Sequence, residues 1–501
     1  MDKKKSLLNV IVSTLSKIVM LVVAIWVRRY VIRYLGNGIN GLNSLYLNVL
    51  DVLSLAELGI GEAITYCMYR PIVENDESKT NAIYNALRRI YNVIALIVLL
   101  IGFMLMPFLD KLAKDYQSIG INLQLPFALM LASTFITYLY GPESALFTAH
   151  KKQYVVTAIY AGGRILQYVL QILVLVLTKS FLCFLTARIV AALCQWTLTR
   201  ILAIKQYGHL MKGKQRIDDG TVKEIRKNVG AMFLHKISAV FVGSTDSILI
   251  SAFVGMEILG RYANYTTIVT SMTGVIGMLF VPLTAVIGHL YLGADKEKFR
   301  QYYHFFHGFN LCVAIVFFLG YYSVIDSLVA ILFGADLELQ RAVKIVITLS
   351  YFIQFSRKAS LLFRNATGLF YFDRWKALVE GVVNLILSWI FVQYWGIVGV
   401  LAATIITNMC ICLTVEPYIL HKHVFKASCK KYYVRNYAYI ALFAVALMYL
   451  DGQMVAVSNI WLQMIENGVR SLAVSFAACA IILATNRDYR QFVKDALLKS
   501  R

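Results

Sequence analysis

The residues most able to bind a ligand are polar side chains that recur at helical spacing inside long apolar runs. The clearest case is the run YVVTAIYAGGRILQYVLQILVLVL at 154–177. Its polar positions follow one another at i, i+4, i+7, i+8 and i+11, which places them on one face of a helix. That face combines a cation, amides and aromatic rings, and a pure packing face would be less polar. Its members are Tyr160, Arg164, Gln167, Tyr168 and Gln171.

Other apolar runs carry similar polar faces, and several of them contain a cation. Inside a membrane such groups face protein or water, because lipid does not solvate them. A cavity with surplus positive charge favours an anion, and the planar guanidinium fork of arginine suits phosphate. Amides, hydroxyls and aromatic faces suit a sugar, so the pattern predicts an anionic, sugar-bearing lipid as cargo. The further predicted cargo-binding residues are Lys17, Arg28, Arg33, Arg188, Lys236, Gln354, Arg357, Lys358, Arg364 and Asn384.

Carboxylates inside apolar runs are the second group of candidates, because a membrane-embedded acid requires a partner. Glu57 lies in LSLAELGIGEAI at 53–64, and we expect it to pair with Lys17 or with another cavity cation. The pair is either a fixed staple or a switch that opens when a proton, an ion or a cargo phosphate competes. Asp246 and Glu380 are further candidates for gating, or for coupling to a proton or sodium gradient.

The composition requires that long apolar helices position these residues. Hydrophobic residues make up 59% of the 501 residues, charged residues make up 15%, and the mean hydropathy is +0.66. Soluble domains contain about 45–50% apolar residues and about 25% charged residues. Apolar runs of about 20 residues, long enough to cross a bilayer, recur from end to end. The sequence predicts an all-α polytopic membrane protein with about fourteen spans. They are 7–34, 42–68, 88–108, 121–146, 153–178, 181–204, 228–253, 262–289, 304–324, 342–370, 376–394, 396–418, 433–450 and 460–485.

The placement of basic residues predicts the orientation of these spans. With the N-terminus inside, 31 of the 49 Lys and Arg residues fall in inner loops and tails and only 9 in outer connections. This asymmetry follows the positive-inside rule and puts both termini in the cytoplasm. It also accounts for most of the net charge of +22, so the basic composition does not indicate a nucleic-acid partner.

The two halves of the chain echo each other. LGNGINGLNSLY in the first half and VGMEILGRYANY in the second share Gly-x4-Gly-x4-Tyr at an offset of 219 residues, each between the first and second span of its set. An even number of spans per repeat predicts two parallel six-helix lobes around a central cationic cavity, with two extra C-terminal helices. The predicted parts are an N-lobe at 1–205, a cytoplasmic linker at 206–227, a C-lobe at 228–425, and the last two helices with a cytoplasmic tail at 426–501.

Two stretches resemble a known family. LGNGINGLNSLYLNVLDVLSLAELGIGEAITYCMYRPI in the first half and NATGLFYFDRWKALVEGVVNLILSWIFVQYWGIVGVLAATIIT in the second are similar to polysaccharide repeat-unit flippases of the multidrug/oligosaccharidyl-lipid/polysaccharide exporter (MOP) superfamily. The resemblance implies movement of undecaprenyl-diphosphate-linked oligosaccharide from the inner to the outer leaflet of the bacterial cytoplasmic membrane, for capsule, O-antigen or other surface polysaccharide. It also implies a polysaccharide polymerase and chain-length machinery as partners.

Other functions remain as alternatives. An ion-coupled multidrug exporter of the same superfamily would need an acidic or apolar cavity. A membrane enzyme such as a polymerase or ligase would usually need a large outer loop with catalytic groups, and the outer connections show no such constellation. No P-loop, CxxC pair or complete metal-ligand set occurs, so we expect a transporter without enzymatic activity or cofactor. We further expect Arg164→Ala and Arg357→Ala to fold and to block export.

Overall fold

The computed structural model describes residues 3–57, 60–213, 243–293 and 296–486, together with 215, 217, 220, 222, 223 and 490. Within these ranges the chain forms helices and turns and no strand, which confirms the predicted all-α class. Contacts divide the chain into two compact units, residues 1–260 and 261–501. The predicted boundaries at 205 and 228, and the central cavity between lobes, stay predictions.

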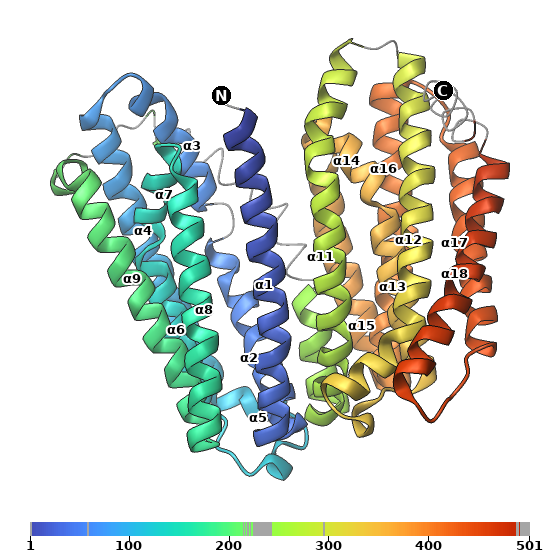
Figure 1. Cartoon of the computed structure of the whole chain (residues 1–501). Coiled ribbons are helices and arrows are strands. Elements are labelled where there is room, and N and C mark those ends of the chain that lie inside the picture. The colour runs from blue at the N-terminus through green and yellow to red at the C-terminus, as the bar shows by residue number, and fades with distance from the viewer. Residues whose placement is uncertain are drawn as a thin grey trace. The chain divides into compact units, whose positions relative to one another are not determined.

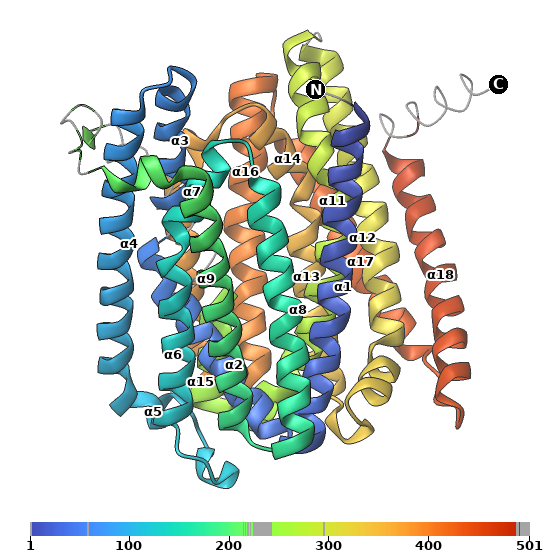
Figure 2. The same ribbon diagram turned by 60° about the vertical axis from the view of Figure 1, so that its left-hand side comes forward.

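The first unit is a set of long helices that lie side by side. Helix α1 packs along α8, and α8 packs along α9 (Figure 1, Figure 2). Helix α6 packs against both α9 and α4. The bounds are α1 Lys3–Leu35, α2 Asn37–Leu53, α3 Ile60–Val73, α4 Glu77–Leu105, α5 Leu109–Leu112, α6 Gln124–Leu139, α7 Gly141–Ala149, α8 Gln153–Thr178 and α9 Phe181–Lys212.

The second unit is arranged around α12, which packs against α13, α17 and α18. Helix α13 packs in turn against α15. Helix α11 begins at the end of the first unit and continues into the second. The bounds are α11 Met256–Gly293, α12 Lys296–Leu332, α13 Arg341–Ser356, α14 Lys358–Ala366, α15 Phe370–Thr407, α16 Leu413–Leu420, α17 Lys430–Gly452 and α18 Ile460–Thr485.

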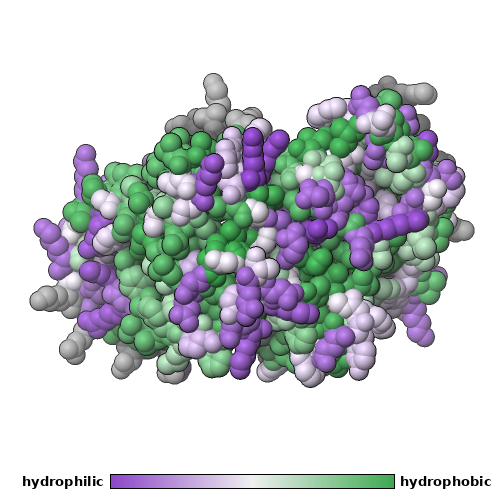
Figure 3. Space-filling view, turned by 90° about the horizontal axis from the view of Figure 1, so that it is seen from below, coloured by the Kyte–Doolittle hydropathy of each residue, from purple (hydrophilic) through white to green (hydrophobic). Residues whose placement is uncertain are grey.

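Helices fall on all fourteen predicted spans, although the seventh, 228–253, is described only from residue 243. Among the described helices, eight are long and apolar enough to cross a membrane. Their outward faces agree with this: on α4 the residues Val93, Leu96, Leu100, Phe103 and Met104 are 48–68% exposed. Such apolar surface is a liability in water and is satisfied by lipid. Hydrophilic side chains are interspersed with hydrophobic ones over the helix ends seen in Figure 3.

Helix α15 and its continuation form a hairpin. The run is 51 residues long, or about 76 Å at 1.5 Å per residue, more than twice the hydrocarbon thickness of about 30 Å. Gly396 interrupts it with a positive φ of 54°. On either side of this turn, Asn384 donates to Thr404 at 3.0 Å and Lys376 donates to Glu416 at 2.7 Å. These pairs join antiparallel arms, so the run supplies the predicted spans 376–394 and 396–418.

Among the described residues, three predicted spans are interrupted rather than continuous. The span at 42–68 is divided by a 3-10 turn, Ser54–Glu57, where the Ser54 hydroxyl donates to the carbonyl of Asp51 at 2.7 Å and so competes with the helical bond. The span at 121–146 breaks where α7 begins, next to Pro142, which lacks an amide donor. The span at 342–370 breaks at Arg357, between α13 and α14.

The repeated glycine motifs lie against each other. A Cβ atom on Gly41 would overlap the carbonyl oxygen of Met256, and a Cβ on Gly260 would overlap the carbonyl oxygen of Asn37. With the offset of 219, Met256 corresponds to Asn37 and Gly260 to Gly41, so each motif contacts the other reciprocally. This reciprocity supports the predicted internal repeat.

Hydrogen bonds also join the two glycine motifs. The side-chain amide of Asn37 donates to the carbonyl of Glu257 at 2.9 Å and to its carboxylate at 2.8 Å. Asn40 donates to the carbonyl of Gly260 at 3.2 Å. The motif tyrosines are both fully buried, and each uses its hydroxyl: Tyr46 donates to the carbonyl of Leu123, and Tyr265 to the carboxylate of Asp326.

Candidate functional site

A cavity of about 150 Å³ lies within the first unit, between α1, α2, α8 and α9. Six predicted cargo-binding residues meet there, although they come from three helices: Arg28, Arg164, Gln167, Tyr168, Gln171 and Arg188. Asn40 and Asn43 of α2 add amides that the sequence analysis did not select. The other described lining residues are apolar: Ala24, Val27, Val31, Leu47, Phe184 and Leu185.

A chain of hydrogen bonds orders the polar face of α8. The Nε of Arg164 donates to the hydroxyl of Tyr160 at 3.1 Å, and its Nη1 reaches Oε1 of Gln167 at 3.5 Å. Gln167 donates to Gln171 at 3.4 Å, and Gln171 donates to the carbonyl of Phe184 at 3.5 Å. The guanidinium carbon of Arg164 also lies 5.2 Å from the centroid of the Tyr160 ring. The cation is therefore held in place by neutral groups.

The charge in this cavity is positive. Its described lining contains three guanidinium groups and no carboxylate. Within the described chain, neither Arg164 nor Arg188 has a carboxylate oxygen within the 4.0 Å of an ion pair. Both arginines are only half-buried. Such a site can bind a planar or tetrahedral anion through paired hydrogen bonds.

The second unit holds a different arrangement, an ionic cluster formed by Arg357, Lys376, Glu380 and Glu416. Arg357 forks onto Glu416, with its Nη2 2.5 Å from Oε1 and its Nε 3.2 Å from Oε2. Its Nη1 lies 3.3 Å from Glu380 and also donates to Asn408. Lys376 lies 2.7 Å from Glu416 and 3.1 Å from Glu380.

This cluster is neutral and largely removed from water. The four side chains are 12%, 5%, 8% and 0% exposed in the order above. It joins the break between α13 and α14 to both arms of the α15 hairpin and to α16. Here the Arg357 guanidinium is shared by two carboxylates. We therefore revise the expectation that Arg357→Ala folds normally, because the substitution would leave two buried acids with one cation.

The remaining predicted residues of the second unit are placed separately from this cluster. Gln354 donates to the hydroxyl of Ser350 at 3.3 Å. The ammonium of Lys358 lies 4.9 Å from the Phe355 ring. Arg364 donates to Asn365 at 3.0 Å. Asn384 is fully buried and bonds across the hairpin.

In the first unit, Arg33 is exposed beside Tyr34 and does not line the cavity. Glu57 accepts a hydrogen bond from the hydroxyl of Tyr91 at 2.9 Å. Asp246 is buried in the segment Gly243–Val254. Lys236 and the side chain of Lys17 lie outside the described residues, so the predicted Glu57–Lys17 pair stays a prediction.

No protein-family model matches the chain, and no curated protein matches its sequence. Solved structures do resemble it. The lipid II flippase MurJ, in an inward closed conformation, is 12% identical, with a TM-score of 0.64 over 95% of this chain and 99% of that one. An inward-facing multidrug resistance MATE family transporter of the MOP superfamily is 16% identical, with a TM-score of 0.60 over 81% and 94%. A MOP superfamily transporter from Pyrococcus furiosus is 13% identical, with a TM-score of 0.52 over 84% and 96%.

These comparisons define the fold. The chain is a multi-pass membrane protein with the helical architecture that MurJ and the MATE transporters share. This agrees with the superfamily that the sequence resembles.

Proposed function

We propose that the protein is a flippase that moves undecaprenyl-diphosphate-linked oligosaccharide from the inner to the outer leaflet of the bacterial cytoplasmic membrane. One observation carries the proposal. Three arginines, four side-chain amides and a tyrosine meet in a single cavity whose described lining has no carboxylate. Permanent positive charge suits a diphosphate, and amides with an aromatic face suit the sugars.

In this proposal the arginines and the neutral groups bind different parts of the cargo. Arg164 and Arg188 bind the diphosphate, and Gln167, Gln171 and Tyr168 contact the first sugars. The lipid tail stays in the bilayer while the protein alternates between inward-open and outward-open states. A proton or sodium gradient drives the cycle. The termini lie in the cytoplasm, and a polymerase and chain-length machinery receive the product.

A multidrug exporter is the second candidate, because the likeness to the inward-facing MATE transporter, at a TM-score of 0.60, is close to that of the flippase. The charge of the cavity supports the flippase over the exporter. A cationic drug would meet three guanidinium groups, which repel it, whereas an anionic lipid is attracted.

The test is transport in proteoliposomes that contain the purified full-length protein and a fluorescent undecaprenyl-diphosphate-linked oligosaccharide. A membrane-impermeant quencher reports the label that reaches the opposite leaflet. We expect Arg164→Gln and Arg188→Gln each to slow flipping by roughly 10- to 150-fold at low cargo concentration, since a hydrogen bond to a charged group contributes about 1.5–3 kcal/mol.

Lys205→Gln is the matched control, because Lys205 lies exposed on the same helix as Arg188 and does not line the cavity. Its rate should equal that of the wild type. Equal rates in all variants, with melting temperatures unchanged, would reject the cavity assignment. A wild-type protein that exports a cationic dye and does not flip the lipid would favour the exporter.

A further inference from the structure

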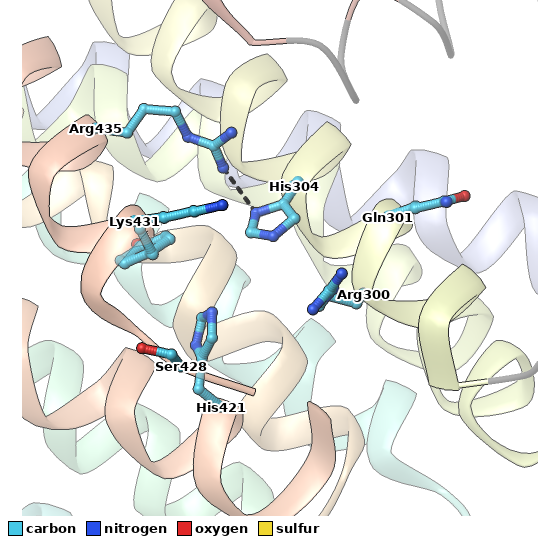
Figure 4. Close-up of a pocket in the computed structure, with 8 residues that line it drawn as sticks. Arg300, Gln301, His304, His421, Ser428, Lys431 and Arg435 are labelled. Carbon is cyan, nitrogen blue, oxygen red and sulfur yellow. Dashed lines mark hydrogen bonds between the residues drawn. The ribbon is translucent and has the colours of Figure 1, made fainter. Parts of the chain in front are cut away.

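A second cavity, of about 250 Å³, lies within the second unit and plays no part in the function proposed above. It is enclosed by the first turns of α12, the π-helical turn His421–Phe425 that follows α16, and the first turns of α17. In Figure 4, Arg300 and Lys431 extend close to His304 from different elements. The described lining residues are Arg300, Gln301, His304, His421, Ser428, Lys431, Tyr432 and Arg435.

The cavity is strongly basic. Three of its described lining side chains are permanent or near-permanent cations, and none is a carboxylate. Arg435 is not paired with a carboxylate among its described neighbours. Its guanidinium donates to Nδ1 of His304 at 2.8 Å and to Oδ1 of Asn486 at 3.3 Å, both neutral acceptors. Its Nε is buried without a hydrogen-bond partner in the described chain.

Hydrogen-bond chemistry assigns the state of the histidine. Arginine has no acceptor atom, so Nδ1 of His304 must accept from Arg435 and carries no proton. The proton of the neutral ring is then on Nε2, which is a donor. The second histidine, His421, uses its Nδ1–H to donate to the carbonyl of Pro417 at 2.8 Å.

The start of α17 adds to the positive potential. This helix is 23 residues long, begins at Lys430, and has no side-chain cap at Cys429. The amino end of a helix carries a partial positive charge. Ser428 and Lys431, on either side of this end, both line the cavity.

We propose that this cavity binds a phosphate group, either a small soluble phosphate or the headgroup phosphate of an anionic phospholipid. Its volume of about 250 Å³ accommodates a phosphate and part of a headgroup. The elements that form it begin or end on the side predicted to be cytoplasmic. Basic pockets between transmembrane helices on that side suit anionic headgroups. The proposal depends on the second unit alone and not on the identity of the cargo.

The test compares two adjacent lysines, of which one lines the cavity and the other does not. Both lysines are exposed, but only Lys431 lines the cavity. We would measure binding by native mass spectrometry and by thermal stabilisation of the full-length protein. The probes are inorganic pyrophosphate in detergent, and nanodiscs of cardiolipin in phosphatidylcholine compared with phosphatidylcholine alone.

We expect Lys431→Ala to weaken binding of the effective probe about fivefold, since a basic residue near an anionic surface contributes about 1 kcal/mol. Lys430→Ala should bind like the wild type, and Lys431→Ala with Arg300→Gln should abolish binding. Response to pyrophosphate would identify a soluble phosphate, and response to cardiolipin alone a lipid headgroup. Failure of both probes, or equal loss in Lys430→Ala and Lys431→Ala, would overturn the proposal.

Discussion

Glu416 is the more buried of the two carboxylates that contact both cations of the ionic cluster, and Glu416→Gln tests how the second unit is held together. The substitution keeps the shape of the side chain and removes its charge. An NH2 group replaces one of the two carboxylate oxygens, and this group cannot accept a hydrogen bond from Arg357 or Lys376. The net charge of the cluster changes from zero to +1, with Glu380 as its remaining carboxylate.

The magnitude follows from the burial of the cluster. Glu416 is 0% exposed, and the cations that contact it are 12% and 5% exposed. Removing one partner of a buried ion pair destabilises a protein by about 3–5 kcal/mol. For a unit of this size, about 2–4 °C per kcal/mol gives a melting temperature lowered by roughly 6–20 °C. The assay is thermal unfolding of the purified protein, followed by intrinsic fluorescence.

Two further variants separate charge imbalance from loss of packing. Lys376→Met combined with Glu416→Gln leaves Arg357 and Glu380 as a neutral pair, so we expect it to recover part of the lost stability. Glu74→Gln removes the acid of an exposed pair with Arg70, whose atoms lie 2.8 Å apart, and should change stability by less than about 1 kcal/mol. Two results would refute the reasoning. One is a double variant whose loss of stability equals the sum of the losses of its two single variants. The other is a Glu416→Gln protein with the same melting temperature as Glu74→Gln.

Other substitutions test the first unit. Gly41→Ala should destabilise by about 1–3 kcal/mol, because its methyl group would overlap the backbone of Met256. Gly38→Ala would meet side-chain atoms and no backbone, with Ile119 at 3.3 Å, and should be milder by the same thermal assay. Tyr91→Phe removes the donor 2.9 Å from Glu57, which predicts a loss of about 1.5–3 kcal/mol. If Tyr91→Phe has the same melting temperature as the wild type, the hydrogen bond between Tyr91 and Glu57 does not stabilise the fold.

Helical periodicity was sufficient to find much of the positive cavity. The polar stripe of α8 is visible in the sequence because all its members lie within one uninterrupted helix. The structure places Gln167 and Gln171 in the cavity with Arg164, as the spacing requires. The contribution of Asn40 was missed because it lies in a glycine-rich segment that was interpreted as a connection between spans.

The ionic cluster could not be found in this way. Its members are separated by up to 59 residues along the chain, and their meeting depends on the turn at Gly396. Lys376 lies at the predicted start of a span, where a cation usually indicates the membrane interface. Glu416 directly precedes Pro417, and the residue before a proline often ends a helix.

Arg164 and Arg357 show why a buried cation in the sequence does not define a binding site. Both follow the same rule, a guanidinium on the polar face of an apolar helix. Arg357 is 12% exposed and meets two carboxylates, as expected where water cannot solvate the charge. Arg164 is half-buried and is bonded only to neutral groups among its described neighbours. A charge that neutral groups and water can stabilise keeps its capacity to attract an anion, whereas a charge already paired with carboxylates does not. The distribution of acids around each arginine, which only the tertiary structure determines, therefore favours the first unit as the site of cargo binding.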